Sequence, residues 1–392
     1  MSTETTVRTQ AEAPASGRHR RGRRANSQTG AGWLFVLPTV LILGVFLLIP
    51  VVMAAWVSVS DWNGRGSPFN SNVHYVGFAN YTEMVSGRGL AARDFGTAIR
   101  NNLYYVVFVV PLQTALALGL AFMVNKRALR GKGFFRTAFY FPSVTSTVAI
   151  TVLWLFLFSA TGAVNAFLGL LSVQGPNWFQ DPRGVFHLIV GTDEAPAALS
   201  QPGFLGISTW EWLAGPSIAM CAFILMAVFT TSGTFMLLFL AALQSIGEET
   251  DEAAMVDGAS TWQRFWHITL PMLRPTLFTV ITLGLIGTWQ VFDQIYTGSK
   301  GGPSKTTLTP AFLSYTSAFE SQKWGRGAAI AFILFAIIVL CTLIQRLILG
   351  EADPTQPSRR DRRAARTIAR RAARASGTKP ATKSNEAGGS DG

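Results

Sequence analysis

Six long apolar runs constrain this chain more than any other feature of its sequence. They lie at about 33–59, 103–124, 138–158, 218–243, 276–296 and 328–349. The hydrocarbon core of a bilayer is roughly 30 Å thick, and an α-helix needs about 20 apolar residues to cross it. Because lipid offers no hydrogen bonds to the backbone, segments of this kind cross a membrane as helices. The sequence therefore predicts an all-α integral membrane protein with six transmembrane helices.

Charged residues are scarce, and most of the excess positive charge lies at the two ends of the chain. Only 14% of the 392 residues are charged, against about 25% in a typical soluble domain. Of the net charge of +12, residues 1–32 carry +4 and residues 350–392 carry +5. Neither end has an apolar period, so we expect two disordered basic tails around a transmembrane domain at 33–349. An Arg-rich tail next to a last span favours contact with anionic lipid over nucleic acid.

The distribution of Lys and Arg predicts the orientation. If both termini are cytoplasmic, 24 of these residues lie inside the cell and 9 lie outside. The loop 126–136 contributes five basic residues and no acid to the inside. Because cytoplasmic loops are enriched in Lys and Arg, we expect a multi-pass protein of the cell membrane with both termini in the cytoplasm. The two cysteines lie inside apolar runs, so no disulfide framework is indicated.

The cytoplasmic loop between the fourth and fifth spans is too strongly patterned to be a simple connector. Residues Glu252 to Val256 favour a helix with acids in its first turn. Gly258 is suited to end that helix, because glycine enters the left-handed region without strain. Ser260 is suited to cap a second helix, whose apolar residues recur at helical spacing at Trp262, Phe265, Trp266 and Leu270. Pro271 is expected to end or kink it.

Two interpretations of this loop are open from its residues. A helix resting on the lipid surface is one, and a helix that docks onto a protein is the other. The loop has five acids, Glu248, Glu249, Asp251, Glu252 and Asp257, against two arginines, Arg264 and Arg274. Acidic segments are not attracted to the anionic inner leaflet, so the composition favours a protein partner.

The same loop resembles the EAA loop of permease subunits of binding-protein-dependent ABC importers. The residues that carry the resemblance are Glu252, Ala253, Ala254, Gly258, Ile268, Leu270, Pro271 and Pro275. Further strings, including Asn101-Asn102-Leu103 and Phe141-Pro142, are similar to the carbohydrate-uptake branch, the maltose- or glycerol-phosphate-type first permease with a MetI-like transmembrane domain. The chain departs from that pattern at Gly247, where Pro is usual, and across residues 183–212 of an outer loop, which have the character of an insertion.

This resemblance implies a transport subunit that does not itself hydrolyse ATP. The chain contains no G-x-x-x-x-G-K-[ST] phosphate loop, so ATP and Mg are expected on a partner ATPase and no cofactor on this chain. The implied partners are a second permease subunit, two ATPase subunits and an extracytoplasmic solute-binding protein. The residues then expected to couple the permease to the ATPase are Glu252, Ala253, Ala254, Asp257, Gly258, Ile268, Leu270 and Pro271. A sugar is the expected substrate.

Candidates for the substrate route lie near the outer end of the fifth span. Sugars need hydrogen-bonding groups and flat apolar faces, which this stretch offers in Trp289, Gln290, Phe292, Asp293 and Tyr296. Asp293 is the only acid inside a predicted span, and an ionisable group there points to function; a local cap at the membrane interface is the alternative. No histidine has a partner at metal-ligand spacing, so no metal site is expected. A permease for another small polar solute and a secondary transporter remain as alternative functions.

Overall fold

The computed structural model describes residues 22–86, 89–126, 129–191, 196, 198–201 and 203–350. Most of the two predicted tails, 1–21 and 351–392, therefore lies outside the described residues. The first helix begins at Gly22 rather than at Trp33, so the last part of the predicted N-terminal tail is helical. No proline interrupts the segment before Pro38, and a helix already nucleated by an apolar span extends at little cost through residues such as Arg, Ala and Gln.

The regular secondary structure of the described residues is helical, and extended segments form only isolated bridges such as Ser60 with Tyr75. Four helices are long and apolar enough to cross a membrane. The first is formed by α1, η1 and α2 (Gly22–Leu43, Gly44–Leu48, Ile49–Ser58). The others are α4 (Gly89–Asn125), α10 (Ile218–Ser245) and α17 (Trp324–Leu349).

Two further candidate spans are bent. Helices α5 (Lys132–Val144) and α6 (Thr147–Leu157) meet at 98°. The short helices α12, η4 and α13 (Thr261–Arg264, Phe265–Thr269, Leu270–Met272) meet α14 (Arg274–Trp289) at 68°. Counting each bent pair as one span, the structure has between four and six candidate spans.

The bend between α5 and α6 differs from the continuous helix predicted over 138–158. Pro142 lies inside the last turn of α5 and has no N–H to offer the preceding turn. Side-chain hydroxyls take up neighbouring carbonyls: Ser143 Oγ donates to Tyr140 O at 2.7 Å, and Thr145 Oγ1 donates to Phe141 O at 3.0 Å. Hydroxyls that bond the backbone in this way compete with the helix, and Thr145 is extended.

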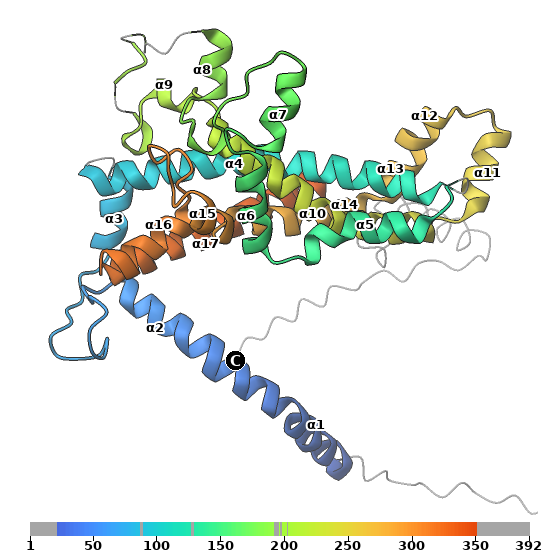
Figure 1. The fold of residues 1–392 in the computed structure, drawn as a ribbon. Helices are drawn as coiled ribbons and strands as arrows, with labels where there is room; N and C mark the ends of the chain where they lie inside the picture. Colours follow the sequence, from blue (N-terminus) through green and yellow to red (C-terminus); the bar gives the residue numbers. More distant parts are fainter. Residues whose placement is uncertain are drawn as a thin grey trace, which may run out of the picture.

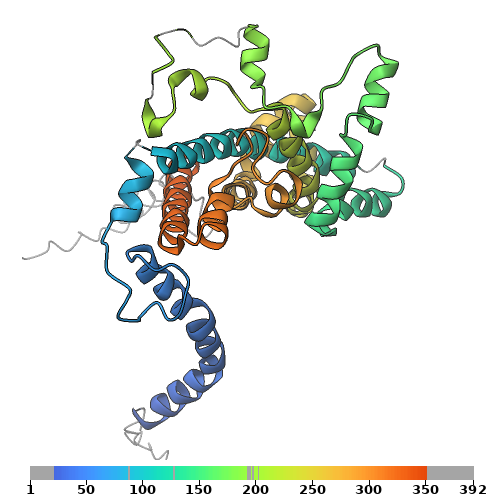
Figure 2. The same ribbon diagram turned by 60° about the vertical axis from the view of Figure 1, so that its left-hand side comes forward.

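Helix α4 is the centre of the bundle. It runs nearly the whole length of the molecule and packs against α10 and α14, as Figures 1 and 2 show. The α4–α10 contact has small residues on one side and large apolar side chains on the other, such as Ala117 and Ala121 against Met236 and Phe239. These side chains are buried from solvent. The close fit of small against large residues makes α4 and α10 the rigid part of the fold.

The first span behaves differently from the other helices. Figures 1 and 2 show α1 and most of α2 extending away from the bundle. Only the end of α2 packs, against α17, where Val57 and Ser58 are buried. The other large apolar side chains from Trp33 to Val52 are exposed within this chain. A helix with so much apolar surface requires lipid or another subunit around it.

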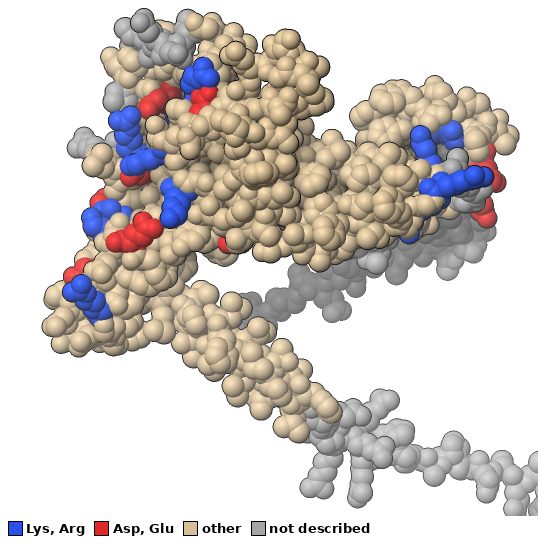
Figure 3. All heavy atoms as spheres, in the orientation of Figure 1, with Lys and Arg blue, Asp and Glu red and all other residues tan. Residues whose placement is uncertain are grey.

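Charged side chains gather at the two ends of the molecule. One end carries α3 (Ala79–Val85), α8 (Val185–Val190) and α9 (Thr209–Trp212), and the opposite end carries α11 (Glu248–Val256) and α12. Figure 3 shows blue and red atoms at both ends and a nearly charge-free stretch between them. The remaining short helices are α7 (Ala163–Leu170), η2 (Trp178–Gln180), η3 (Phe204–Gly206), α15 (Asp293–Gly298), α16 (Pro310–Tyr315) and η5 (Thr316–Glu320).

Candidate functional site

The segment between α10 and α14 forms a helix–turn–helix at one charged end of the molecule (Figure 1). Helix α11 ends at Val256, and Gly258 follows with φ of +78°. The Gly258 N–H donates to Met255 O at 3.1 Å, and the Ala259 N–H donates to Ala254 O at 3.0 Å. These bonds satisfy the last carbonyls of α11 in the manner of a left-handed C-cap. The glycine predicted to close this helix does so.

The second helix of this segment begins with the predicted cap. The Gln263 N–H donates to Ser260 Oγ at 3.3 Å, and the Ser260 N–H donates to Gln263 Oε1 at 2.8 Å. This reciprocal pair is a capping box. The ring of Phe265 then lies 5.3 Å from that of Phe122 on α4, which anchors the segment to the bundle. Its neighbour Trp262 is left 68% exposed.

The eight residues expected to couple the permease to the ATPase lie in this segment. Glu252, Ala253, Asp257 and Gly258 are exposed, Ala254 is buried, and Ile268, Leu270 and Pro271 are half-buried. Val256, which the sequence patterns did not single out, is 88% exposed. The end of α11 therefore exposes an apolar residue, Val256, between the acids Glu252 and Asp257. Such a mixed surface suits a protein partner with a basic and apolar recess.

A second feature is a break in helix between α14 and α15, at residues 290–292. The carbonyl groups freed there are bonded by other helices and loops. Asn102 Nδ2 donates to Trp289 O at 3.4 Å, and Thr309 Oγ1 donates to Val291 O at 3.1 Å. Irregular backbone at membrane depth is tolerated where it is buried in protein or lines a cavity. The side chains next to the break are therefore candidates for lining a cavity.

The five substrate-route candidates divide at this break. Trp289 is buried among Val106, Val110, Leu334 and Ile338. Phe292 is half-buried, and its ring stacks on that of Tyr296 at 5.4 Å. Gln290, Asp293 and Tyr296 are exposed, and Asp293 lies in the first turn of α15. A carboxylate at that position also complements the helix dipole.

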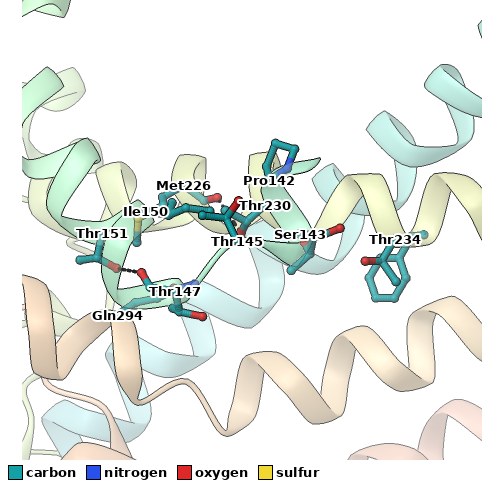
Figure 4. A pocket seen from close by; sticks show the side chains of 12 residues that line it. Pro142, Ser143, Thr145, Thr147, Ile150, Thr151, Met226, Thr230, Thr234 and Gln294 are labelled. Carbon is teal, nitrogen blue, oxygen red and sulfur yellow. Dashed lines mark hydrogen bonds between the residues drawn. The ribbon is translucent and has the colours of Figure 1, made fainter. Parts of the chain in front are cut away.

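A pocket of about 260 Å³ lies beside this break, at the bend between α5 and α6. Its wall comes from α5, α6, α10 and α15. Figure 4 shows Gln294 of α15 turned toward Thr147 and Thr151 of α6. The polar lining consists of hydroxyl and amide groups, from Ser143, Thr145, Thr147, Thr151, Thr230, Thr231, Thr234 and Gln294. None of the five sequence candidates is among the lining residues.

The hydrogen bonds around the pocket prepare its polar groups for a ligand. Thr151 Oγ1 donates to Thr147 O at 2.7 Å, and Thr230 Oγ1 donates to Met226 O at 3.0 Å. A hydroxyl that donates to its own helix keeps its lone pairs for other donors. The Tyr105 hydroxyl donates to Gln294 Oε1 at 2.9 Å and orients that amide. Among the residues that the structure describes, no charged side chain lines the pocket, so its chemistry suits a neutral, hydroxyl-bearing solute.

Sequence reasoning missed this pocket because its residues come from four helices. A signal was nevertheless present in two hydroxyl-rich stretches within apolar surroundings, at 143–147 and 230–234. Each stretch separately is consistent with ordinary helix packing. Only the bend between α5 and α6 brings the two together.

The chain is similar to known transport proteins of the cell membrane. Residues 113–349 match the family of binding-protein-dependent transport system inner membrane components. The chain is 31% identical over 320 residues to the lactose transport system permease protein LacF of Rhizobium radiobacter, covering 80% of this chain and 92% of that protein. It is 29% identical over 314 residues to the trehalose/maltose transport system permease protein MalF of Thermococcus litoralis, covering 80% and 91%.

A solved structure supports the same fold. The bacterial ABC transporter involved in import of the acidic polysaccharide alginate contains a chain that superposes with a TM-score of 0.62 at 20% identity, covering 85% of this chain and 100% of that one. The family match and the permease relatives thus define a membrane permease. The chain belongs to the family of binding-protein-dependent transport system inner membrane components. It is an inner-membrane permease subunit of an ABC importer, and it is not the ATPase.

Proposed function

We propose that this permease imports a sugar or sugar derivative through six spans, with both termini in the cytoplasm. The end that carries α11 and α12 is then cytoplasmic, and the end that carries α8 and α9 is extracytoplasmic. The excess of Lys and Arg on one side, 24 against 9, supports this orientation. The two charged ends that flank a nearly charge-free band (Figure 3) support a position across a membrane. A membrane accommodates such a band and excludes the ends.

The observation that carries the substrate proposal is the uncharged, hydroxyl-lined pocket at the α5–α6 bend. Sugars are recognised by a few convergent polar groups in a mostly apolar setting, which this pocket supplies. The similar permeases are described as transporting lactose and trehalose or maltose. The exposed side chains of Gln290, Asp293 and Tyr296 extend the route from Gln294 along the same segment. Another small polar solute with several hydroxyls is the second candidate.

The α11–α13 segment is the proposed contact with the ATPase. Its exposed acids and Val256 form the docking surface, and the ATPase subunits hold the ATP and Mg. The exposed apolar surface of α1 and α2 is the proposed contact with lipid and with a second permease subunit. An extracytoplasmic solute-binding protein delivers the sugar at the opposite end. Energy reaches the substrate route as a coupling free energy between the two sites.

Uptake of a panel of labelled sugars by the reconstituted complex tests the substrate proposal. Thr147→Val and Thr234→Val each remove one pocket hydroxyl while keeping nearly the same shape. A hydrogen bond contributes about 0.5–1.5 kcal/mol net, so the KM for the transported sugar should rise by about 2- to 13-fold. Thr279→Val is the matched control, because Thr279 is an exposed residue on α14 outside the pocket. If the control raises KM as much as the pocket variants do, the pocket is not the substrate site.

A further inference from the structure

A second cavity lies at the end of the molecule that we assign to the outside. It measures about 550 Å³ and lies between the first turns of α4, the segment before α8, α9 and the loop at 304–306. Its lining includes Arg93, Arg100, Arg183 and Lys305. These are four of the nine basic residues that the sequence places outside. Because outer segments are normally poor in Lys and Arg, the convergence of four in one cleft is a specific feature. Figure 3 shows the blue atoms that gather at this end.

Three of these cations have a carboxylate partner. Arg93 Nη2 lies 3.2 Å from Glu211 Oε1, Arg183 Nη2 lies 2.6 Å from Asp181 Oδ2, and Lys305 Nζ lies 2.6 Å from Asp94 Oδ1. The pair of Arg93 with Glu211 joins α4 to α9, and the pair of Lys305 with Asp94 joins the loop at 304–306 to α4. Ion pairs on a surface add little stability individually, but these two fix the walls of the cleft relative to α4.

The pKa values of two of these paired carboxyls, Asp181 and Glu211, agree with this arrangement. Hydrogen bonding from the Arg183 side chain lowers the pKa of Asp181. Burial alone would raise the pKa of Glu211, but hydrogen bonds from the Ser208 backbone and hydroxyl, with the charge of Arg93, lower it below its usual value. Both carboxyls are therefore charged at neutral pH, and each already has a cationic partner.

The fourth cation, Arg100, has neutral partners. Its Nη2 and Nε donate to Asn101 Oδ1 at 3.0 and 3.3 Å, and its Nη1 donates to the backbone O of Glu211 at 3.2 Å. No carboxylate is found within ion-pair distance of it in the described parts of the chain. The His187 ring also lines the cleft, stacked on Trp210 at 4.2 Å, and its Nε2 is buried without a partner among the described residues.

We propose that this cleft is a docking socket for an acidic side chain on the extracytoplasmic binding protein, with Arg100 as the group that receives the carboxylate. The proposal rests on the proposed function, which supplies the binding protein and the orientation. A guanidinium presents paired N–H donors that match a carboxylate. Complementary charge at such a contact raises the association rate and fixes the register of docking.

A protein carboxylate fits this cleft better than the transported solute does. The pocket at the α5–α6 bend contains no charged side chain, so the solute that passes it is neutral and gains little from a cation. The cleft shares no lining residue with that pocket. Four of its lining residues, Arg183, Gly184, His187 and Glu211, lie in the stretch 183–212, where the sequence departs from the family pattern. A wall particular to this chain is suited to select one binding protein among several.

Titration of the reconstituted complex with its extracytoplasmic binding protein tests the socket. The readout is stimulated ATP hydrolysis against binding-protein concentration. We expect Arg100→Gln to raise the half-saturating concentration about tenfold with little change in the maximal rate, and Arg100→Lys to raise it less. Raising KCl from 50 to 300 mM should weaken docking of the unaltered complex more than that of Arg100→Gln, because salt screens exposed charges.

A second variant keeps the test decisive if Arg100→Gln fails to assemble. Arg183 is half exposed, and Arg183→Glu puts a repelling carboxylate in the same cleft; we expect the half-saturating concentration to rise more than tenfold. Arg65→Glu is the matched control, because Arg65 is an exposed basic residue that does not line the cleft. Equal docking by Arg183→Glu and the unaltered complex would refute the socket.

Two other outcomes separate the proposals. If the variants change the sugar concentration dependence at saturating binding protein, and the half-saturating concentration of binding protein stays constant, the cleft binds solute and the docking proposal is wrong. If no binding protein stimulates even the unaltered complex, the proposed function itself fails, and the socket with it.

Discussion

Gly258 offers the sharpest test of the coupling segment, the helices α11 to α13 (residues 248–272), because its substitution changes only the backbone strain at the turn. Its φ of +78° lies in the left-handed region, and a Cβ added there meets no atom within 4 Å. A side chain at this position therefore adds backbone strain without a clash. Gly258→Asn, Gly258→Ala and Gly258→Val form a graded series, because Asn tolerates left-handed backbone and a β-branched residue tolerates it least.

The magnitude follows from the conformation. A non-glycine residue held in the left-handed region costs of order 1–3 kcal/mol, with valine at the upper end of that range. Since about 1.4 kcal/mol is a factor of ten in population, the capped turn should lose about 5- to 150-fold in population relative to uncapped states. The docking surface at Glu252 and Val256 would then have the geometry that fits the ATPase for a correspondingly smaller fraction of the time.

Binding-protein-stimulated ATP hydrolysis and sugar uptake by the reconstituted complex measure this effect. We expect both rates to fall in the order Asn, Ala, Val, with insertion into the membrane unchanged. Gly247→Ala is the control: Gly247 has φ of −61° and open space around its Cβ position. A helix that only rests on lipid would tolerate the whole series. Transport by Gly258→Val at the rate of the unaltered protein would refute the docking role of α11.

Three further predictions concern topology, packing and pH. On a background without native cysteines, Ser67→Cys should react with an impermeant thiol reagent from outside and Lys132→Cys should not; labelling of Lys132→Cys from outside would overturn the orientation. Gly233→Ala should lower the Tm of the purified complex, since its Cβ would lie 2.2 Å from Phe139 O and overpacking costs about 1–3 kcal/mol, whereas Gly287→Ala, with open space, should not. Asp181 and Glu211 have lowered pKa values, and the ordinary values of these carboxyls are 3.8 and 4.5. Their stabilising contribution is therefore present above those values and is lost as pH falls through the lower folded-state values. Hydrogen exchange of residues 181–217 should therefore be protected between pH 7 and 5 and should increase only below about pH 4; loosening already at pH 6 would contradict the assignment.

The coupling segment was predictable in detail because local rules determine it. The conformation of Gly258 and the cap at Ser260 each depend on residues within a few positions along the chain, and both predictions are confirmed. The locations of the apolar helices followed from hydropathy in the same way. The fourth run, predicted at 218–243, forms α10 at Ile218–Ser245.

The bends and the pocket were not predictable from such rules. Whether a helix with Pro142 near its end continues or turns by 98° depends on what packs against it. Here α5 packs closely against α10 at Gly233, a contact between segments far apart in the sequence. The second span also begins at Gly89 rather than at Leu103. Its first turns bury Phe95 against Met84, Leu205 and Ile330 of other segments, and a hydropathy scan along the chain does not register such contacts.

The two helices that flank the coupling segment lead to the two halves of the proposed substrate site. Helix α10 is 28 residues long, or about 42 Å; it lines the pocket at Met226 and Thr230 and ends just before α11. Helix α14 begins just after α13 and ends at the break that precedes Gln294, on the opposite wall. A displacement of α11 by the ATPase would therefore act on both walls through rigid helices. Because α5 packs on α10 and α6 contacts α15, the bend between α5 and α6 is the place where the two walls would separate.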